Sequence, residues 1–191
     1  MIYQWFIENR LIMADIFGYL ALFIYIFALQ AQTVKRTALY STPMDFFYAL
    51  HFLMLGAVSG MYVAFMGSVR DLFVAYGSKR TLYLFIVVYI SIIWCATFIV
   101  AKTGVDYIPV VASTSATIGM LFRQNFVLSR AMVYVSQILW ISFFWQIMSV
   151  PGAVGASVVI ISNTVALRRY LVLQEKRRVR HEAALLPATP D

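Results

Sequence analysis

The stretch TLYLFIVVYISIIWCATFIVA, residues 81–101, indicates the fold class of this chain. It contains no charged residue, and Lys79, Arg80 and Lys102 flank it. A helix needs about 20 mostly apolar residues to cross the roughly 30 Å hydrocarbon core of a membrane. The length and composition of this stretch therefore predict a membrane-spanning α-helix.

The composition of the whole chain agrees with this prediction. Hydrophobic residues make up 62% of the 191 positions and charged residues only 12%, whereas soluble domains are about half apolar and a quarter charged. The net charge is +7, but the basic residues separate apolar runs instead of forming a patch, which argues against nucleic acid as a partner. With the single cysteine Cys95, a disulfide framework and a cysteine metal site are excluded, and we expect no cofactor.

Six further apolar runs predict an all-α membrane bundle of seven transmembrane helices. The predicted spans are 13–31, 38–56, 58–76, 81–101, 106–122, 130–148 and 151–171. The junctions at Gly56 and at Pro151-Gly152 carry no charge, so each could be a tight turn or a kink in one long helix. Because the joined runs are about twice as long as one crossing requires, we favour turns.

The positions of the basic residues predict the orientation of the chain. With seven spans and a cytoplasmic C-terminus, only Arg10 and Lys102 lie outside, and the other 13 of the 15 basic residues lie inside. Cytoplasmic loops of membrane proteins carry such an excess of Lys and Arg. We therefore expect a multi-pass protein of a bacterial inner membrane, with its N-terminus outside and its C-terminus in the cytoplasm.

The same order of features occurs twice along the chain. Residues 13–76 and 106–171 each contain a span, a basic loop, a second span, an uncharged hinge and a third span. A second three-span unit keeps the orientation of the first only if one extra crossing separates them, and residues 81–101 supply it. This 3+1+3 order predicts parallel repeats about an axis along the membrane normal.

The two ends of the chain differ from the spans. Residues 1–12 contain Tyr3, Trp5 and Phe6, an aromatic cluster typical of a membrane interface. Residues 174–191 begin with a basic cluster that suits the anionic cytoplasmic leaflet. The remainder of this segment shows no hydrophobic periodicity, so we expect a basic, disordered cytoplasmic tail.

Several residues carry a resemblance to a known family. Leu50–Ala57 is followed one span later by Arg70, while Ile108–Val111 opens a span that Leu121–Arg123 closes. This pattern resembles the bacterial inner membrane protein family typified by YgjV, over most of residues 13–171. The resemblance implies a location in the inner membrane but no established biochemical activity.

Two further details qualify the resemblance. The family pattern has Asn in the middle of the third span, where this chain has Gly67, so a polar contact is expected to be missing there. The residues Leu29-Gln30, followed by Lys35-Arg36, are similar to a motif of PQ-loop and SWEET proteins, without its proline. This more distant similarity implies a transporter built from three-helix repeats.

Polar residues within the predicted spans are the candidate functional residues, because a titratable side chain in hydrocarbon is costly and needs a reason. Asp45 and His51 lie in the second span, about 120° apart around the helix and about 9 Å apart along it. Asp45 could be a proton or cation site and His51 a substrate contact. Alternatively, both could be structural, with His51 hydrogen-bonded across helices.

Arg70 and Asp71 follow in the third span. Arg70 could extend to the cytoplasmic interface, or it could form a buried pair with Asp45 of the preceding antiparallel span. Adjacent residues do not share a helix face, so we expect Arg70 and Asp71 to have different partners.

In the second half, Trp140 and Asn163 are the best candidates to face a solute, although such residues also join helices. No phosphate-binding loop, H-E-x-x-H or G-x-S-x-G motif is present, and we expect no enzymatic activity. Our first hypothesis is a small transporter-like protein that carries a small polar solute along a path formed by Asp45, His51, Trp140 and Asn163. The alternative is a non-transporting accessory or assembly protein whose polar groups only hold helices together.

Overall fold

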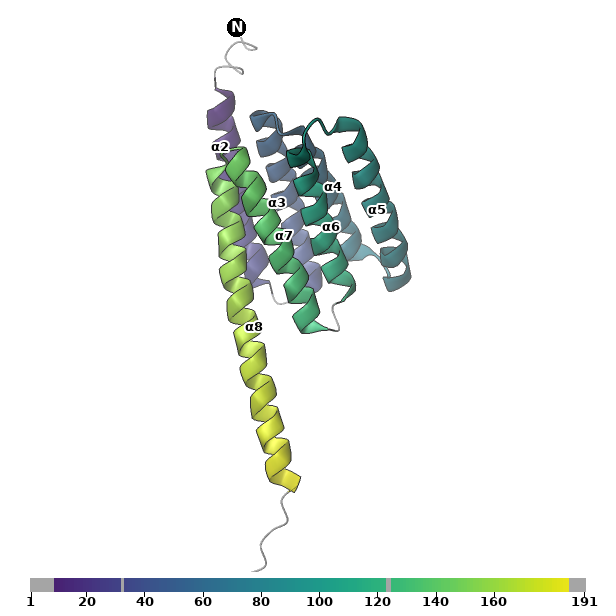
Figure 1. Cartoon of the computed structure of the whole chain (residues 1–191), viewed down its shortest axis with the longest axis vertical. Helices are drawn as coiled ribbons and strands as arrows, with labels where there is room; N and C mark the ends of the chain where they lie inside the picture. The colour runs from purple at the N-terminus through teal and green to yellow at the C-terminus, as the bar shows by residue number, and fades with distance from the viewer. Residues whose placement is uncertain (1–8, 32, 123–124, 186–191) are drawn as a thin grey trace, which may run out of the picture.

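The computed structural model describes residues 9–31, 33–122 and 125–185, and this part of the chain folds into helices without strands (Figure 1). The α-helices are α2 (Arg10–Gln30), α3 (Val34–Leu55), α4 (Val58–Tyr76), α5 (Lys79–Val100), α6 (Ile108–Leu121), α7 (Phe126–Gln146) and α8 (Val150–Leu185). A short 3-10 helix, η1 (Gly104–Tyr107), precedes α6. The expectation of an all-α protein is confirmed.

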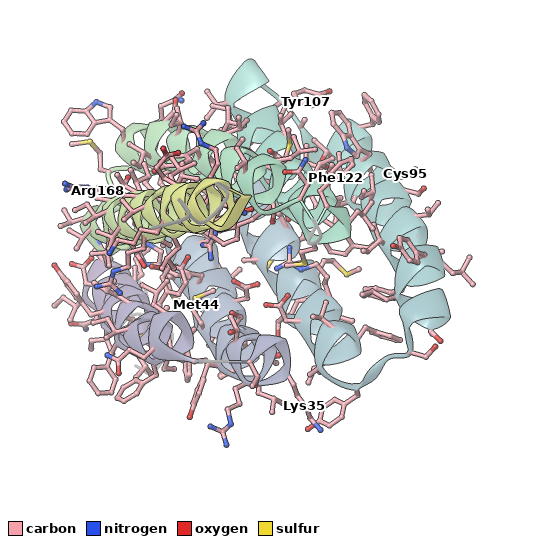
Figure 2. The ribbon with its side chains drawn as sticks, turned by 90° about the horizontal axis from the view of Figure 1, so that it is seen from below. Lys35, Met44, Cys95, Tyr107, Phe122 and Arg168 are labelled. Atoms are coloured by element: carbon pink, nitrogen blue, oxygen red, sulfur yellow. The ribbon has the colours of Figure 1, made fainter. Side chains whose placement is uncertain are left out.

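Six of the helices form a closed ring. Packing follows the chain from α2 to α3 to α4 and from α6 to α7 to α8, and contacts of α2 with α8 and of α4 with α6 close the ring. Helix α5 packs on the outside against α4 and α6. In the view along the bundle, α5 with its exposed Cys95 lies at the edge of the molecule (Figure 2).

Five helices are long and apolar enough to cross a membrane: α2, α4, α5, α7 and α8. Helix α6 has 14 residues, about 21 Å at 1.5 Å per residue, and η1 extends it at its N-terminal end. Helix α3 has 22 residues but carries the polar and charged side chains of the second predicted span. Large apolar side chains cover the outside of the bundle, among them Leu84 (69% exposed) and Ile99 (85%) on α5, as expected for lipid contact.

Small residues permit the close packing of α2 in the ring. Ala14, Ala21 and Ala28 recur every seven residues on one face of α2 and are at most 2% exposed. A β-carbon at Gly18 would lie 2.5 Å from Pro151 of α8 and 2.9 Å from His51 of α3. Such small residues let helix backbones approach each other in a membrane.

Both uncharged junctions are tight turns between antiparallel helices, not kinks, and each contains one left-handed residue. At the first junction this residue is Gly56, with φ of 75°. At the second it is Met148, with φ of 55°, while Pro151 and Gly152 belong to the first turn of α8. The backbone hydrogen bonds match: Gly56 N–H to Leu53 O and Ala57 N–H to Phe52 O, and Met148 N–H to Trp145 O and Ser149 N–H to Phe144 O.

Helices α3 and α7 begin four residues before the predicted spans. The side chains of Thr33 and Asn125 cap them, accepting hydrogen bonds from the backbone N–H groups of Arg36 and Leu128. The basic residues Lys35, Arg36 and Arg130 therefore belong to helices rather than to loops, contrary to the sequence prediction. Arg123, the other basic residue expected in the second loop, lies outside the described residues.

Helix α8 continues to Leu185 and projects beyond the bundle (Figure 1). The prediction of disorder from residue 174 is therefore wrong as far as Leu185. Residues 171–185 are mostly good helix formers such as Leu, Glu, Lys, Arg and Ala, and Arg178 pairs with Glu175 one turn earlier at 3.0 Å. Residues 186–191 and the aromatic cluster predicted within residues 1–8 lie outside the described part.

The connection between α5 and α6 is held by Asp106. Its carboxylate accepts hydrogen bonds from the backbone of Lys102 and Thr103, from the Thr103 hydroxyl and from the Ser59 hydroxyl at the start of α4. Burial raises the pKa of Asp106, but these four hydrogen bonds outweigh it and lower the pKa below the usual value. The connection is thus tied to α4 by an ionised carboxylate.

Candidate functional site

The ring of helices surrounds a partly open cavity of about 350 Å³. All six ring helices contribute lining residues, and α5 contributes none. The lining extends along α3 from Thr37 to Phe52 and along α7 from Ser129 to Phe144, about 22 Å at the rise of an α-helix. The volume falls in the range of small-molecule pockets, roughly 300 to 1,000 Å³.

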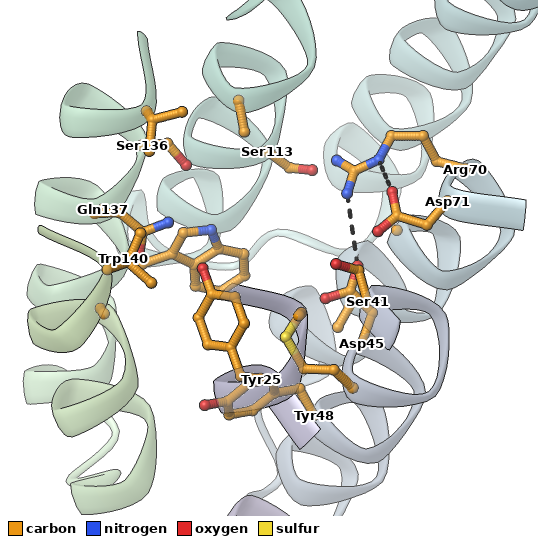
Figure 3. Close-up of a pocket in the computed structure, with 18 of the residues that line it drawn as sticks. Tyr25, Ser41, Asp45, Tyr48, Arg70, Asp71, Ser113, Ser136, Gln137 and Trp140 are labelled. Atoms are coloured by element: carbon orange, nitrogen blue, oxygen red, sulfur yellow. Dashed lines mark hydrogen bonds and ion pairs between the residues drawn. The ribbon is translucent and has the colours of Figure 1, made fainter. Parts of the chain in front are cut away.

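Three charged side chains of α3 and α4 gather on one side of this cavity (Figure 3). The Nε of Arg70 donates to the Asp71 carboxylate at 2.8 Å, and its Nη2 lies 3.6 Å from Oδ2 of Asp45. The guanidinium also donates to the hydroxyl of Thr117 on α6, at 3.2 Å, and faces the ring of Tyr89. Arg70 thereby joins α3, α4 and α6 in the interior of the bundle.

The structure tests three expectations about this cluster. Arg70 is only 8% exposed, so the alternative in which it extends to the membrane interface is wrong. The buried pair of Arg70 and Asp45 is confirmed. The expectation that Arg70 and Asp71 have different partners is wrong, because a buried guanidinium with five donors bonds to any carboxylate within reach, including that of its neighbour.

Gly67 provides the space for the Asp45 carboxylate. A β-carbon at position 67 would lie 2.6 Å from Oδ2 of Asp45, too close for any side chain to fit without displacement. Position 67 therefore faces Asp45 directly. In this chain the absence of a side chain there brings the carboxylate against the backbone of α4.

Aromatic side chains of α3 and α7 form the apolar end of the cavity. Phe52 and Phe144 lie nearly parallel, with centroids 5.8 Å apart. Trp140 stacks on Phe52 at 5.8 Å, and Tyr48 contacts Phe144 at 6.1 Å. The cavity thus has a charged side on α3 and α4 and an aromatic end shared between α3 and α7.

Neutral polar groups line the α7 side of the cavity, opposite the charged cluster (Figure 3). Gln137 and Ser136 are the central ones. Ser136 is 1% exposed, and its Oγ is the only buried side-chain polar atom of the described residues without a hydrogen-bond partner. A buried, unpaired hydroxyl costs free energy unless something bonds to it.

His51 does not line the cavity. It is fully buried between helices, where Nδ1 lies 2.7 Å from the carbonyl oxygen of Ala14 and Nε2 lies 2.7 Å from the hydroxyl of Ser149. Since a carbonyl only accepts, Nδ1 carries the proton and donates it. The side chain therefore fastens α3 to α2 and to the turn before α8, which is the structural alternative of the sequence prediction.

Asn163 also joins helices and does not line the cavity. Its amide accepts a hydrogen bond from Nη1 of Arg130 at 2.9 Å and donates to the carbonyl oxygen of Arg130 at 3.1 Å. Arg130 itself reaches the cavity from the second turn of α7 and packs over the ring of Phe126. Of the four residues of the predicted path, the structure brings Asp45 and Trp140 to one cavity and places His51 and Asn163 in helix contacts.

Sequence reasoning missed Tyr25, Tyr48 and Ser136 as lining residues. Tyr48 could have been found, because it follows Asp45 by three residues and therefore lies near it on the same helix face. No sequence pattern marks Tyr25 or Ser136. Among the described residues, no three His, Cys, Asp or Glu side chains are grouped so that they could hold a metal ion.

Comparison with known proteins identifies the family. The model of the Imp-YgjV family, bacterial inner membrane protein, matches residues 12–174. No curated protein and no solved structure matches the chain. The match covers all seven helices except the first residues of α2 and the C-terminal extension of α8. The chain therefore belongs to the Imp-YgjV family of bacterial inner membrane proteins.

Proposed function

We propose that the chain is a carrier, not an enzyme, and that it binds a small polar solute in the cavity of the helix ring. The observation that carries this proposal is the unpaired hydroxyl of Ser136, which lines the same cavity as the buried Arg70 cluster. Polar and charged groups inside a membrane bundle are expensive, and they commonly mark the path of a substrate or ion. A cavity with such groups and an aromatic end can hold a solute away from lipid.

A duplicated 3+1+3 architecture with seven crossings completes the proposal, and local geometry supports it. The two left-handed residues, Gly56 and Met148, are 92 positions apart. Five further pairs of residues with the same role in the two halves are also 92 positions apart. They are the helix caps Thr33/Asn125, the aromatic residues Phe52/Phe144 and Tyr48/Trp140, the glycines Gly60/Gly152 and the cavity-lining residues Asp45/Gln137. An axis that exchanges the halves also exchanges the α2–α8 contact with the α4–α6 contact.

The proposed orientation has the N-terminus outside and the C-terminus in the cytoplasm. The connections from α2 to α3, α4 to α5 and α6 to α7 lie at the end of the bundle from which α8 projects (Figure 1). Most basic residues of the chain belong to this end, whereas Lys102 precedes η1 at the opposite end. The excess of positive charge supports its assignment to the cytoplasm.

Ligand screening and uptake measurements test the carrier function. Purified protein in lipid nanodiscs is screened with amines, amino acids, polyols and carboxylates, and stabilising compounds are then assayed for uptake into proteoliposomes. We expect Ser136→Ala to weaken the stabilisation and the uptake while leaving the unliganded protein at least as stable, because the unpaired hydroxyl is removed. Ser91→Ala on α5, outside the ring, is the matched control and should change neither.

The alternative is an accessory or assembly protein that moves no solute. The observation that favours it is the use of His51 and Asn163 in helix contacts. It predicts that no compound stabilises the protein through the cavity and that liposomes with and without protein take up solutes equally. Stabilisation by a compound that depends on Ser136 would contradict it.

A further inference from the structure

The charges around Asp45 do not balance. Two carboxylates, those of Asp45 and Asp71, share the single guanidinium of Arg70 in the buried cluster. We propose that the cavity binds a small organic cation, a protonated amine, whose ammonium group is held by Asp45. This inference rests on the proposed solute-binding function and names the chemical class of the solute.

The two carboxylates differ in how closely they bind Arg70. Asp71 makes the short contact of 2.8 Å and its side chain is 4% exposed, whereas Asp45 lies at 3.6 Å and its side chain is 16% exposed. The guanidinium of Arg70 therefore interacts more strongly with Asp71 than with Asp45. Both carboxylates line the cavity, but Asp45 is the more loosely held and the more exposed of the two. A buried carboxylate without a full partner is strongly unfavourable, so a cation gains affinity there.

The second guanidinium of the cavity does not supply the missing charge. Arg130 is seven residues before Gln137 on α7, about 10 Å along the helix, and Figure 3 shows Gln137 opposite Asp45. Its Nη1 donates to Asn163, and its guanidinium packs over Phe126. Among the described residues, these two partners of Arg130 are neutral, so its charge stays at the other end of the cavity.

The remaining lining groups suit an ammonium ion. An ammonium group has donors and no acceptor, and the Ser136 hydroxyl and the amide oxygen of Gln137 can accept from it opposite Asp45. Tyr48 and Trp140 supply aromatic rings, which attract cations within about 6 Å of their centroids. An anion would instead meet the surplus carboxylate, and the described residues offer no cluster of ligands for a metal ion.

The internal 92-residue spacing shows that the negative charge belongs to one half only. Gln137 occupies the position equivalent to Asp45, and Asn163 the position equivalent to Asp71. Both carboxylates of the Arg70 cluster are thus amides in the second half. The cavity therefore offers one carboxylate site for one cation, and Gln137 is the natural position at which to add a second.

Binding of matched compounds to the protein in lipid nanodiscs tests the proposal. One set comprises cyclohexylmethylamine, its neutral analogue cyclohexylmethanol and the anion cyclohexanecarboxylate; a smaller set comprises ethanolamine, ethylene glycol and glycolate. We expect at least one amine to bind tenfold or more tightly than its neutral and anionic analogues. Asp45→Asn should weaken the amine at least tenfold, whereas Asp15→Asn, an exposed carboxylate of α2, should leave it unchanged.

A second variant tests the proposal even if the Asp45→Asn protein does not fold. Gln137→Glu adds a carboxylate across the cavity, and we expect it to strengthen amine binding at least threefold. Preferential binding of the neutral or anionic analogues, weakened by Ser136→Ala, would overturn the cation assignment but leave the solute-binding function in place. Failure of both amines to bind would also overturn the assignment, and the wider screen described above then decides on the function by itself.

Discussion

The guanidinium of Arg70 lies 3.6 Å from the carboxylate of Asp45, and this contact connects α4 to α3 inside the membrane bundle. It belongs to a cluster in which Asp71 makes the closer contact, at 2.8 Å. The partners of this cluster are therefore not equivalent, and their removal should have unequal consequences.

We predict that Arg70→Met destabilises the protein far more than Asp45→Asn. Without Arg70 two buried carboxylates lose their cation, at a cost of about 3–5 kcal/mol, whereas Arg70 without Asp45 keeps its closer partner and the loss should stay near 1 kcal/mol. Unfolding in SDS-containing mixed micelles measures both. Adding Asp45→Asn to Arg70→Met should recover part of the loss, and equal destabilisation by the two single substitutions would contradict the assignment of partners.

Gly67→Ala should displace the Asp45 carboxylate. The new β-carbon would lie 2.6 Å from Oδ2 of Asp45, and overpacking of this kind costs about 1–3 kcal/mol. Thermal unfolding and amine binding should both be impaired. Gly104→Ala is the matched control, because a β-carbon there meets nothing within 4 Å. An unchanged Gly67→Ala protein would show that the carboxylate has room to move.

His51→Ala should lower stability without a specific effect on transport. The substitution removes the hydrogen bonds of His51 to the carbonyl of Ala14 and to the hydroxyl of Ser149, each worth about 0.5–1.5 kcal/mol. Thermal unfolding should report the loss, while uptake per folded molecule should equal that of the wild type. A selective loss of uptake at unchanged stability would return His51 to the solute path.

The contribution of Asp106 to the stability of the protein should depend on pH only under acidic conditions. Its hydrogen bonds hold its pKa below the usual value, which is about 3.9 in the unfolded chain. The stabilisation is therefore fully present above that value and is lost as the pH falls through the lower pKa of the folded state. The difference in unfolding midpoint between wild type and Asp106→Asn should stay constant from about pH 8 to pH 5 and shrink below about pH 4. A difference that grows in acid would reverse the assigned sign.

Much of the secondary structure follows from local sequence. Runs of apolar residues long enough for a membrane helix, and uncharged junctions with turn-forming residues, predicted where helices lie and that Gly56 begins a return. The predicted starts of α3 and α7 were wrong because the capping residues Thr33 and Asn125 begin these helices before the apolar runs begin. The prediction of disorder after residue 174 failed because the residues of the α8 extension have helix propensity without hydrophobic periodicity.

The sequence by itself determined that polar residues such as Asp45, His51, Trp140 and Asn163 need a reason to lie in apolar helices. It also placed Asp45 and His51 about 120° apart around one helix, so that the two side chains point in different directions. Only the tertiary structure decided which face of each helix turns inward: Asp45 and Trp140 reach the cavity, while His51 and Asn163 bond to neighbouring helices. The physical reason is that helical periodicity gives angles within one helix, whereas the rotation of one helix against another depends on packing between distant segments, as at Gly18 and Gly67.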